Sequence, residues 1–401
     1  MQNSTRDKQF QLGFRLTLLE IAIAFVMTFL WPFAIFFPSH YQILTVALGV
    51  AMLTLVAWSA LIRDWRGSYR PSPYFLIPFA IVLVGFIRSI GSGTLDWNQI
   101  AFMAICITPI ILALALTEAR VNVKWVALFG ILFILVNAVG FHGESIVQSG
   151  TSSTTKLNPI PASNLVWMTA LALLISDLRK LWKWSGLITV FTLGVPLMLS
   201  LREIQPLVAG GIAAFVFFAR QREKRASGPG RAFRLAVGSA TLLILLSIVK
   251  TLLSVDLNSG NGLNGTSVRF LFWKDVFTNG SIWGQGFKPY IFYYAGAYDN
   301  ERYPHNYIVD CYRISGIVGL LLVALITIQA IRKAVRKGDP NLPLYVGVMV
   351  FSFTSFGVFL NAPLWIALCA PFASGAVVAP SSLRGMKCSG VGGRVPTITA
   401  R

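Results

Sequence analysis

The chain has 401 residues, of which 55% are hydrophobic and only 12% are charged, and its mean hydropathy is +0.67. Because soluble domains carry about 25% charged residues, this composition excludes a large soluble domain and favours a membrane protein. The formal net charge is +19, and a strongly positive charge is also typical of nucleic-acid-binding proteins. The positions of the basic residues indicate instead that this charge sets the orientation of the protein in a membrane. The four cysteines show neither a disulfide framework nor a metal-ligand spacing.

Apolar runs of nearly 20 residues follow one another along the chain. Runs of this length predict membrane-spanning helices, whereas barrel strands would alternate over about ten residues. We expect about twelve such helices, at residues 16–37, 41–62, 74–90, 97–117, 125–141, 162–176, 185–201, 206–219, 235–253, 307–330, 343–360 and 363–378. The predicted fold is an all-α, polytopic helical bundle that forms a single membrane domain over residues 1–401.

Basic residues are concentrated in every second connection between the predicted helices. With a cytoplasmic N-terminus, most of the 34 Lys and Arg residues fall on the cytoplasmic side, notably in 63–70, 220–234, 331–339 and the tail 379–401. This is the positive-inside distribution, which predicts a multi-pass inner-membrane protein with a cytoplasmic N-terminus. It explains the net charge without nucleic acid as a partner, and the tail is expected to be flexible and cytoplasmic.

Three segments on the predicted periplasmic side carry polar and aromatic residues. Residues 142–161 are rich in Ser, Thr, Asn and Pro and predict a loop. The short connection 199–206 places Arg202 at the outer membrane surface. The longest segment, 254–306, is expected to form an interfacial helix at SVRFLFWKDVF, a turn at GQGF and an approach to the next helix through YPHNY. Long loops in compact membrane proteins usually have a function, so this loop is expected to carry part of an active site.

Three arginines on the predicted periplasmic side oppose the positive-inside bias, so topology does not explain them: Arg202, Arg269 and Arg313. Guanidinium groups bind phosphate in a bidentate manner, and phosphates held at a membrane belong to lipids or lipid-linked donors. Two simpler explanations stay open: each arginine can anchor to lipid headgroups, and Arg313 can pair with Asp310 at a spacing of three residues.

His305 and Asn306 stand at the predicted start of a helix. Asn306 suits the N-cap position, and this Pro-His-Asn start can be plain capping. A histidine, with a reference pKa near 6.5, equally suits a general base. The spacing alone does not separate these two roles. His40 and His142 have no partner pattern and are expected to be solvated residues of the interface.

Four segments resemble, in family order, motifs of the O-antigen ligase and O-antigen polymerase superfamily. LNPIPASN resembles its Asn-Pro helix start, and LSLREIQPLVAGG resembles its Ser-Arg-type junction. SVRFLFWKDVFTNGSIWGQGF resembles its Arg–Trp helix and Gly-x-Gly turn, and PHNYIVDCYRISGIVGL resembles its His-Asn motif with a Gly-x-x-Gly helix. The resemblance covers roughly residues 155–325. The chain departs from the family in its Leu-Arg-Glu junction and in carrying both Asp310 and Arg313 in the histidine helix.

The resemblance implies a GT-C-like membrane glycosyltransferase whose active site faces the periplasm. Its donor would be a glycan on undecaprenyl diphosphate. The acceptor would be a lipid A-core sugar for an O-antigen ligase of lipopolysaccharide biosynthesis, or a second lipid-linked glycan for an O-antigen or exopolysaccharide polymerase. The implied catalytic residues are His305, Arg269 and Arg202, and the implied substrate-binding residues are Arg313, Asn306, Trp273 and Tyr303. No Asp-x-Asp pair occurs on the periplasmic side, so neither a metal nor another cofactor is expected.

Two other classes of protein compete with the enzyme. A transporter of lipid-linked glycans would place charged or polar residues at mid-membrane depth in several helices, and the sequence shows almost none. A membrane scaffold would not need Arg202 and His305. The remaining expected partners are membrane lipids.

Overall fold

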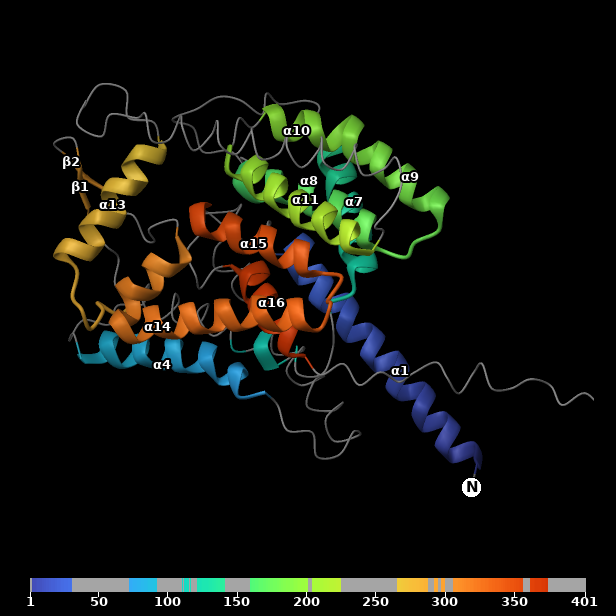
Figure 1. Ribbon diagram of the computed structural model, residues 1–401, viewed down its shortest axis with the longest axis horizontal. Helices are drawn as coiled ribbons and strands as arrows, with labels where there is room; N and C mark the ends of the chain where they lie inside the picture. The colour runs from blue at the N-terminus through green and yellow to red at the C-terminus, as the bar shows by residue number, and fades with distance from the viewer. Residues whose placement is uncertain are drawn as a thin grey trace, which may run out of the picture.

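The computed structural model describes residues 2–30, 72–91, 110, 112–114, 116, 121–140, 159–200, 204–224, 265–287, 292–294, 297–299, 306–355 and 361–373. In these residues the fold is helical, as predicted, apart from one antiparallel hairpin formed by β1 (Phe292–Tyr294) and β2 (Ala297–Asp299) (Figure 1). The all-α fold class is confirmed in the described residues, and the hairpin is a local feature of the long loop. The predicted spans 41–62 and 235–253 and the tail 379–401 lie outside the described residues.

The helices follow the predicted apolar runs closely. Their bounds are α1 (Gln2–Phe25), η1 (Val26–Leu30), η3 (Pro73–Phe75), α4 (Leu76–Gly91), α7 (Val123–Gly140), α8 (Pro159–Ile175), α9 (Lys180–Thr189), η4 (Val190–Gly194), α10 (Val195–Ser200), α11 (Ile204–Lys224), α13 (Gly265–Asn279), α14 (Tyr307–Arg336), α15 (Leu342–Ser355), α16 (Ala362–Cys369) and η5 (Ala370–Phe372). Two stretches, Pro73–Gly91 and Tyr307–Arg336, are long and apolar enough to cross a membrane. The described residues do not establish the arrangement of twelve spans.

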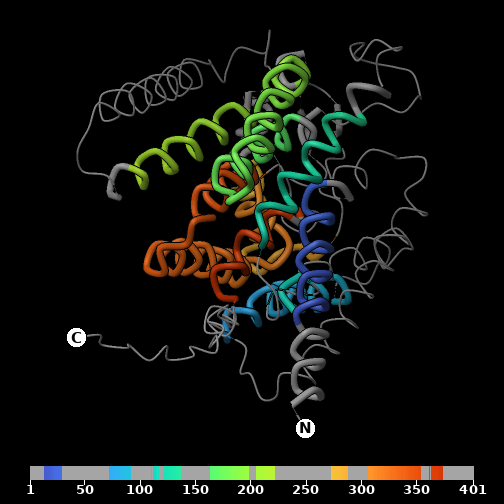
Figure 2. Tube along the Cα trace, turned by 90° about the vertical axis from the view of Figure 1, so that its right-hand side faces the viewer, coloured from blue at the N-terminus to red at the C-terminus, as the bar shows by residue number. Residues whose placement is uncertain are grey.

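Neighbouring helices pack closely where glycine faces a large side chain. α11 lies against both α8 and α15. The indole of Trp167 on α8 fills the space between them, because a Cβ added to Gly210 on α11 or to Gly347 on α15 would lie 3.0 or 2.6 Å from it. In the perpendicular view of Figure 2, α1 (blue) and α14 (orange) lie on opposite sides of the bundle.

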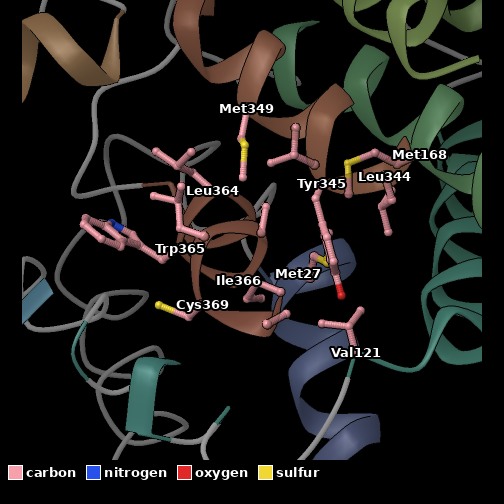
Figure 3. Close-up of a cluster of buried hydrophobic side chains, with 14 of the residues drawn as sticks. Met27, Val121, Met168, Leu344, Tyr345, Met349, Leu364, Trp365, Ile366 and Cys369 are labelled. Carbon is pink, nitrogen blue, oxygen red and sulfur yellow. The ribbon is translucent and has the colours of Figure 1, made fainter. Parts of the chain in front are cut away.

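α16 lies in the interior of the bundle and forms the first part of the predicted span 363–378, of which residues 374–378 lie outside the described residues. Asn361 caps its start by accepting a hydrogen bond from the Leu364 amide (3.0 Å), and its own side-chain amide donates to the Ser352 hydroxyl (2.7 Å). Every side chain from Leu364 to Cys369 is fully buried. Figure 3 shows Met27, Tyr345 and Met349 around this helix.

Polar contacts join several connections between helices at one end of the bundle. The sequence analysis assigns these connections to the cytoplasmic side. The contacts are Asn122 to Glu20 (2.8 Å), Lys124 to Asp177 (2.9 Å), Asn341 to the Val121 carbonyl (3.2 Å), Lys337 to the Pro371 carbonyl (3.0 Å), and Arg220 to the Asp339 carbonyl. The N-terminal part of α1 extends away beyond this end (Figure 1). α13, the hairpin and the start of α14 lie at the opposite end, so the two sets of connections are separated in the structure as they are in the prediction.

Candidate functional site

The helix that follows the His-Asn motif is broken at one residue. Gly316 has φ 63° and ψ −154°, which divides α14 into residues 307–315 and 317–336. A break of this kind leaves backbone carbonyl and amide groups without partners inside the helix. In apolar surroundings such groups must find partners elsewhere in the protein.

The turn at residues 281–287 supplies those partners. Three backbone hydrogen bonds join it to the break: the Gln285 amide to the Arg313 carbonyl (2.7 Å), the Gly286 amide to the Ile314 carbonyl (3.0 Å), and the Ile317 amide to the Ile282 carbonyl (2.9 Å). The predicted Gly-x-Gly turn is therefore confirmed and has a structural role, because it completes the hydrogen bonding of α14.

Glycine is required on both sides of this contact. Gly284 has φ 84°, and a Cβ there would lie 2.4 Å from the Ile314 carbonyl oxygen. A Cβ on Gly316 would lie 2.4 Å from the Ile282 carbonyl oxygen. Since real Cβ atoms do not approach so closely, the two backbones can meet only where neither residue has a side chain.

The end of α4 forms the third side of the contact. The Ser89 hydroxyl accepts a hydrogen bond from the Phe287 amide (2.7 Å) and donates to the Gly85 carbonyl (2.9 Å). The Ser315 hydroxyl donates to the Ile81 carbonyl (2.9 Å). We call this meeting of α4 (Gly85–Ser89), the turn (281–287) and the α14 break (313–317) the glycine junction.

Asn306 fixes the first turn of α14. Its side-chain oxygen accepts hydrogen bonds from the amides of Ile308 (2.9 Å) and Val309 (3.1 Å), and the residue is 1% exposed. The capping role predicted for Asn306 is confirmed. Its implied contact with substrate stays a prediction.

Asp310 and Arg313 form a buried ion pair. The Nε and Nη2 atoms of Arg313 lie 3.1 and 3.0 Å from Oδ1 of Asp310, and the two side chains are 1% and 2% exposed. The predicted pairing at a spacing of three residues is confirmed. Asp310 lies in the first turn of α14, where the helix dipole favours a negative charge. The ion pair with Asp310 explains why Arg313 lies at this end of the bundle, and this explanation requires no bound substrate.

α13 packs against the first part of α14, which confirms the short helix predicted in the long loop. Phe272 and Val276 are buried against Val309 and Tyr312 of α14. Trp273 is half-buried in the same cluster and meets the Phe353 ring of α15 edge-on, at 5.9 Å between ring centroids. Trp273 therefore holds three helices together, and its implied contact with substrate stays a prediction.

The three residues with an implied catalytic role are placed only in part. Arg269 lies in the first half of α13. Arg202, between α10 and α11, and His305, directly before Asn306, lie outside the described residues, as does Tyr303. The structure thus brings together the helix that carries Arg269 and the helix that follows His305.

Arg88 is a candidate that the sequence analysis missed. It lies in the last turn of α4, its side chain is exposed, and its guanidinium carbon is 5.6 Å from the ring centroid of Trp283 in the turn. With the predicted topology, this end of α4 is periplasmic. Arg88 therefore opposes the positive-inside bias in the same way as Arg202 and Arg269, and that signal could have identified it.

Within the described ranges, no group of three or more His, Cys, Asp or Glu residues is placed to hold a metal ion. No protein-family model matches the chain, and no curated protein is significantly similar to it.

Proposed function

We propose that this protein is a multi-pass glycosyltransferase of the bacterial inner membrane that transfers a glycan from undecaprenyl diphosphate on the periplasmic side, as an O-antigen ligase does. One observation carries the proposal. Three segments that resemble motifs of the ligase and polymerase superfamily lie together in the structure: α13 packs against the first part of α14, and the turn 281–287 is hydrogen-bonded to α14 at the glycine junction.

The joined elements suit a site that must hold several groups in fixed positions. The buried contact between α13 and α14 fixes the backbone of Arg269 relative to the cap residue Asn306, which His305 precedes. Catalytic groups need this kind of fixed mutual geometry, because small displacements lower the rate strongly. In this proposal the Asp310–Arg313 pair and Asn306 position the helix, and Trp273 braces it.

The proposed reaction is a displacement at the anomeric carbon of the donor sugar. The acceptor hydroxyl oxygen forms a new bond to that carbon, and the bond from the carbon to the phosphate oxygen breaks. His305 takes the hydroxyl proton, and undecaprenyl diphosphate leaves with the electron pair. Arg269 and Arg202 bind the diphosphate and stabilise the charge that develops on it. We propose that Tyr303 contributes to sugar binding beside them.

The proposed topology has about twelve spans, with both termini in the cytoplasm. It is supported by the position of the basic connections, which lie at the end of the bundle opposite the glycine junction. In this proposal the junction faces the periplasm, where a lipid-linked donor is presented.

A ligase and a polymerase share this chemistry and differ in the acceptor. The test is a transfer assay with purified protein and a lipid-linked glycan, offered either lipid A-core or a second lipid-linked glycan. His305→Ala should lower turnover by about 10²- to 10⁴-fold, the usual contribution of a general base. Arg269→Ala should abolish transfer, whereas His142→Ala serves as the control and should be close to neutral. Parent rates for both the His305 and the Arg269 variants would show that the site is wrongly assigned.

A further inference from the structure

Arg88 lies at the edge of the glycine junction. The adjacent residue, Ser89, anchors the turn through the Phe287 amide at 2.7 Å. The arginine itself lies over the ring of Trp283 in the same turn, and this ring is 57% exposed. The cation therefore lies beside the turn and is open to the surroundings of the protein.

The charge of Arg88 is not neutralised by any described residue, since none of them forms an ion pair with it. A cation–π contact uses none of the five N–H donors of a guanidinium group. These donors are available to an anion, and a phosphate matches their geometry. An arginine at the end of a membrane-spanning helix is costly unless it has such a partner or reaches the headgroup region.

The position of Arg88 favours the donor lipid over ordinary phospholipid. The turn that carries Trp283 is hydrogen-bonded to the carbonyl of Arg313, and Asn306 lies seven residues earlier in α14, or roughly 10 Å along the helix axis. A residue that only anchors the protein among headgroups has no need of a rigid connection to the helix that follows His305.

We infer that Arg88, over Trp283, is a further phosphate-binding residue of the donor site. This inference rests on the proposed function. It assigns to α4 the recognition of the polyprenyl diphosphate, and it leaves proton transfer to His305.

The test measures binding of undecaprenyl diphosphate and of phosphatidylglycerol to detergent-purified protein by native mass spectrometry. Removing a charge-assisted contact with Arg88→Gln should weaken binding of undecaprenyl diphosphate about 10- to 100-fold. Trp283→Leu should weaken it about two- to fivefold, since only the cation–π contact is lost. Arg179→Gln, which changes an exposed arginine at the other end of the bundle, is the matched control and should bind as the parent does. Elution as a single species checks that each variant is folded.

The outcomes separate the inference from the proposed function. Loss of undecaprenyl diphosphate binding by Arg88→Gln with unchanged phosphatidylglycerol binding supports the inference. Equal loss of both lipids shows a general headgroup anchor and overturns it, and so does parent affinity in Arg88→Gln. A parent protein that does not prefer undecaprenyl diphosphate to phosphatidylglycerol contradicts the proposed function itself, and the inference then falls with it.

Discussion

Replacing Gly316 with alanine tests the contact on which the candidate site depends. The backbone at Gly316 has φ 63° and ψ −154°, a conformation that is essentially restricted to glycine and costs another residue about 1–3 kcal/mol. The new Cβ would also lie 2.4 Å from the Ile282 carbonyl oxygen, so the turn must move away from α14. Moving the turn breaks at least one of the three backbone hydrogen bonds between them. A buried polar group left without its partner costs about 1–3 kcal/mol. The expected loss in the free energy of unfolding is therefore about 2–6 kcal/mol.

Gly338 provides a matched control for this variant. It also has φ 63°, but the nearest atom to an added Cβ is Nη2 of Arg220 at 3.8 Å, which is an ordinary contact. Gly338→Ala should therefore lose only the conformational term, about 1–2 kcal/mol. Both free energies can be measured by denaturant titration in mild detergent. Equal losses in the two variants would refute the close contact between the turn and α14.

The positions of most helices could be predicted because their signals are local. The apolar run 74–90 corresponds to Pro73–Gly91, and 125–141 corresponds to α7 (Val123–Gly140). Length, composition and flanking charge set these bounds within the segment itself. The turn at 284–287 and the cap at Asn306 were predictable for the same reason, since each depends on a few consecutive residues.

Features that depend on distant residues were not predictable. An apolar run has the same composition whether lipid or protein surrounds it, so nothing in 363–378 shows that α16 is buried in the core. Gly316 and Gly319 both interrupt an apolar sequence, yet only Gly316 leaves the helical conformation. The difference arises from the turn 281–287, which offers hydrogen-bond partners at Gly316 from a separate part of the chain. Arg88 became a candidate only when the structure placed it over Trp283.

Two ion pairs give the remaining predictions, and they differ in burial. The hydrogen bond from Lys124 holds the pKa of Asp177 below its ordinary value, so this pair stabilises the fold above the ordinary carboxyl pKa and loses its effect as pH falls through the lowered one. Since both side chains are substantially exposed, Lys124→Met should cost at most about 1 kcal/mol near neutral pH, and the difference from the parent should vanish in acid. A difference that persists in acid would show that Lys124 acts through packing instead. The Asp310–Arg313 pair is buried, and Asp310→Asn leaves the guanidinium charge of Arg313 in the interior without its carboxylate, which should cost about 3–5 kcal/mol. The double variant Asp310→Leu/Arg313→Met removes both charges and should recover most of that loss, because two buried charges are costly to desolvate. The measurement is the free energy of unfolding of the parent and of both variants. If the double variant is no more stable than Asp310→Asn, Arg313 is needed for contacts other than the ion pair.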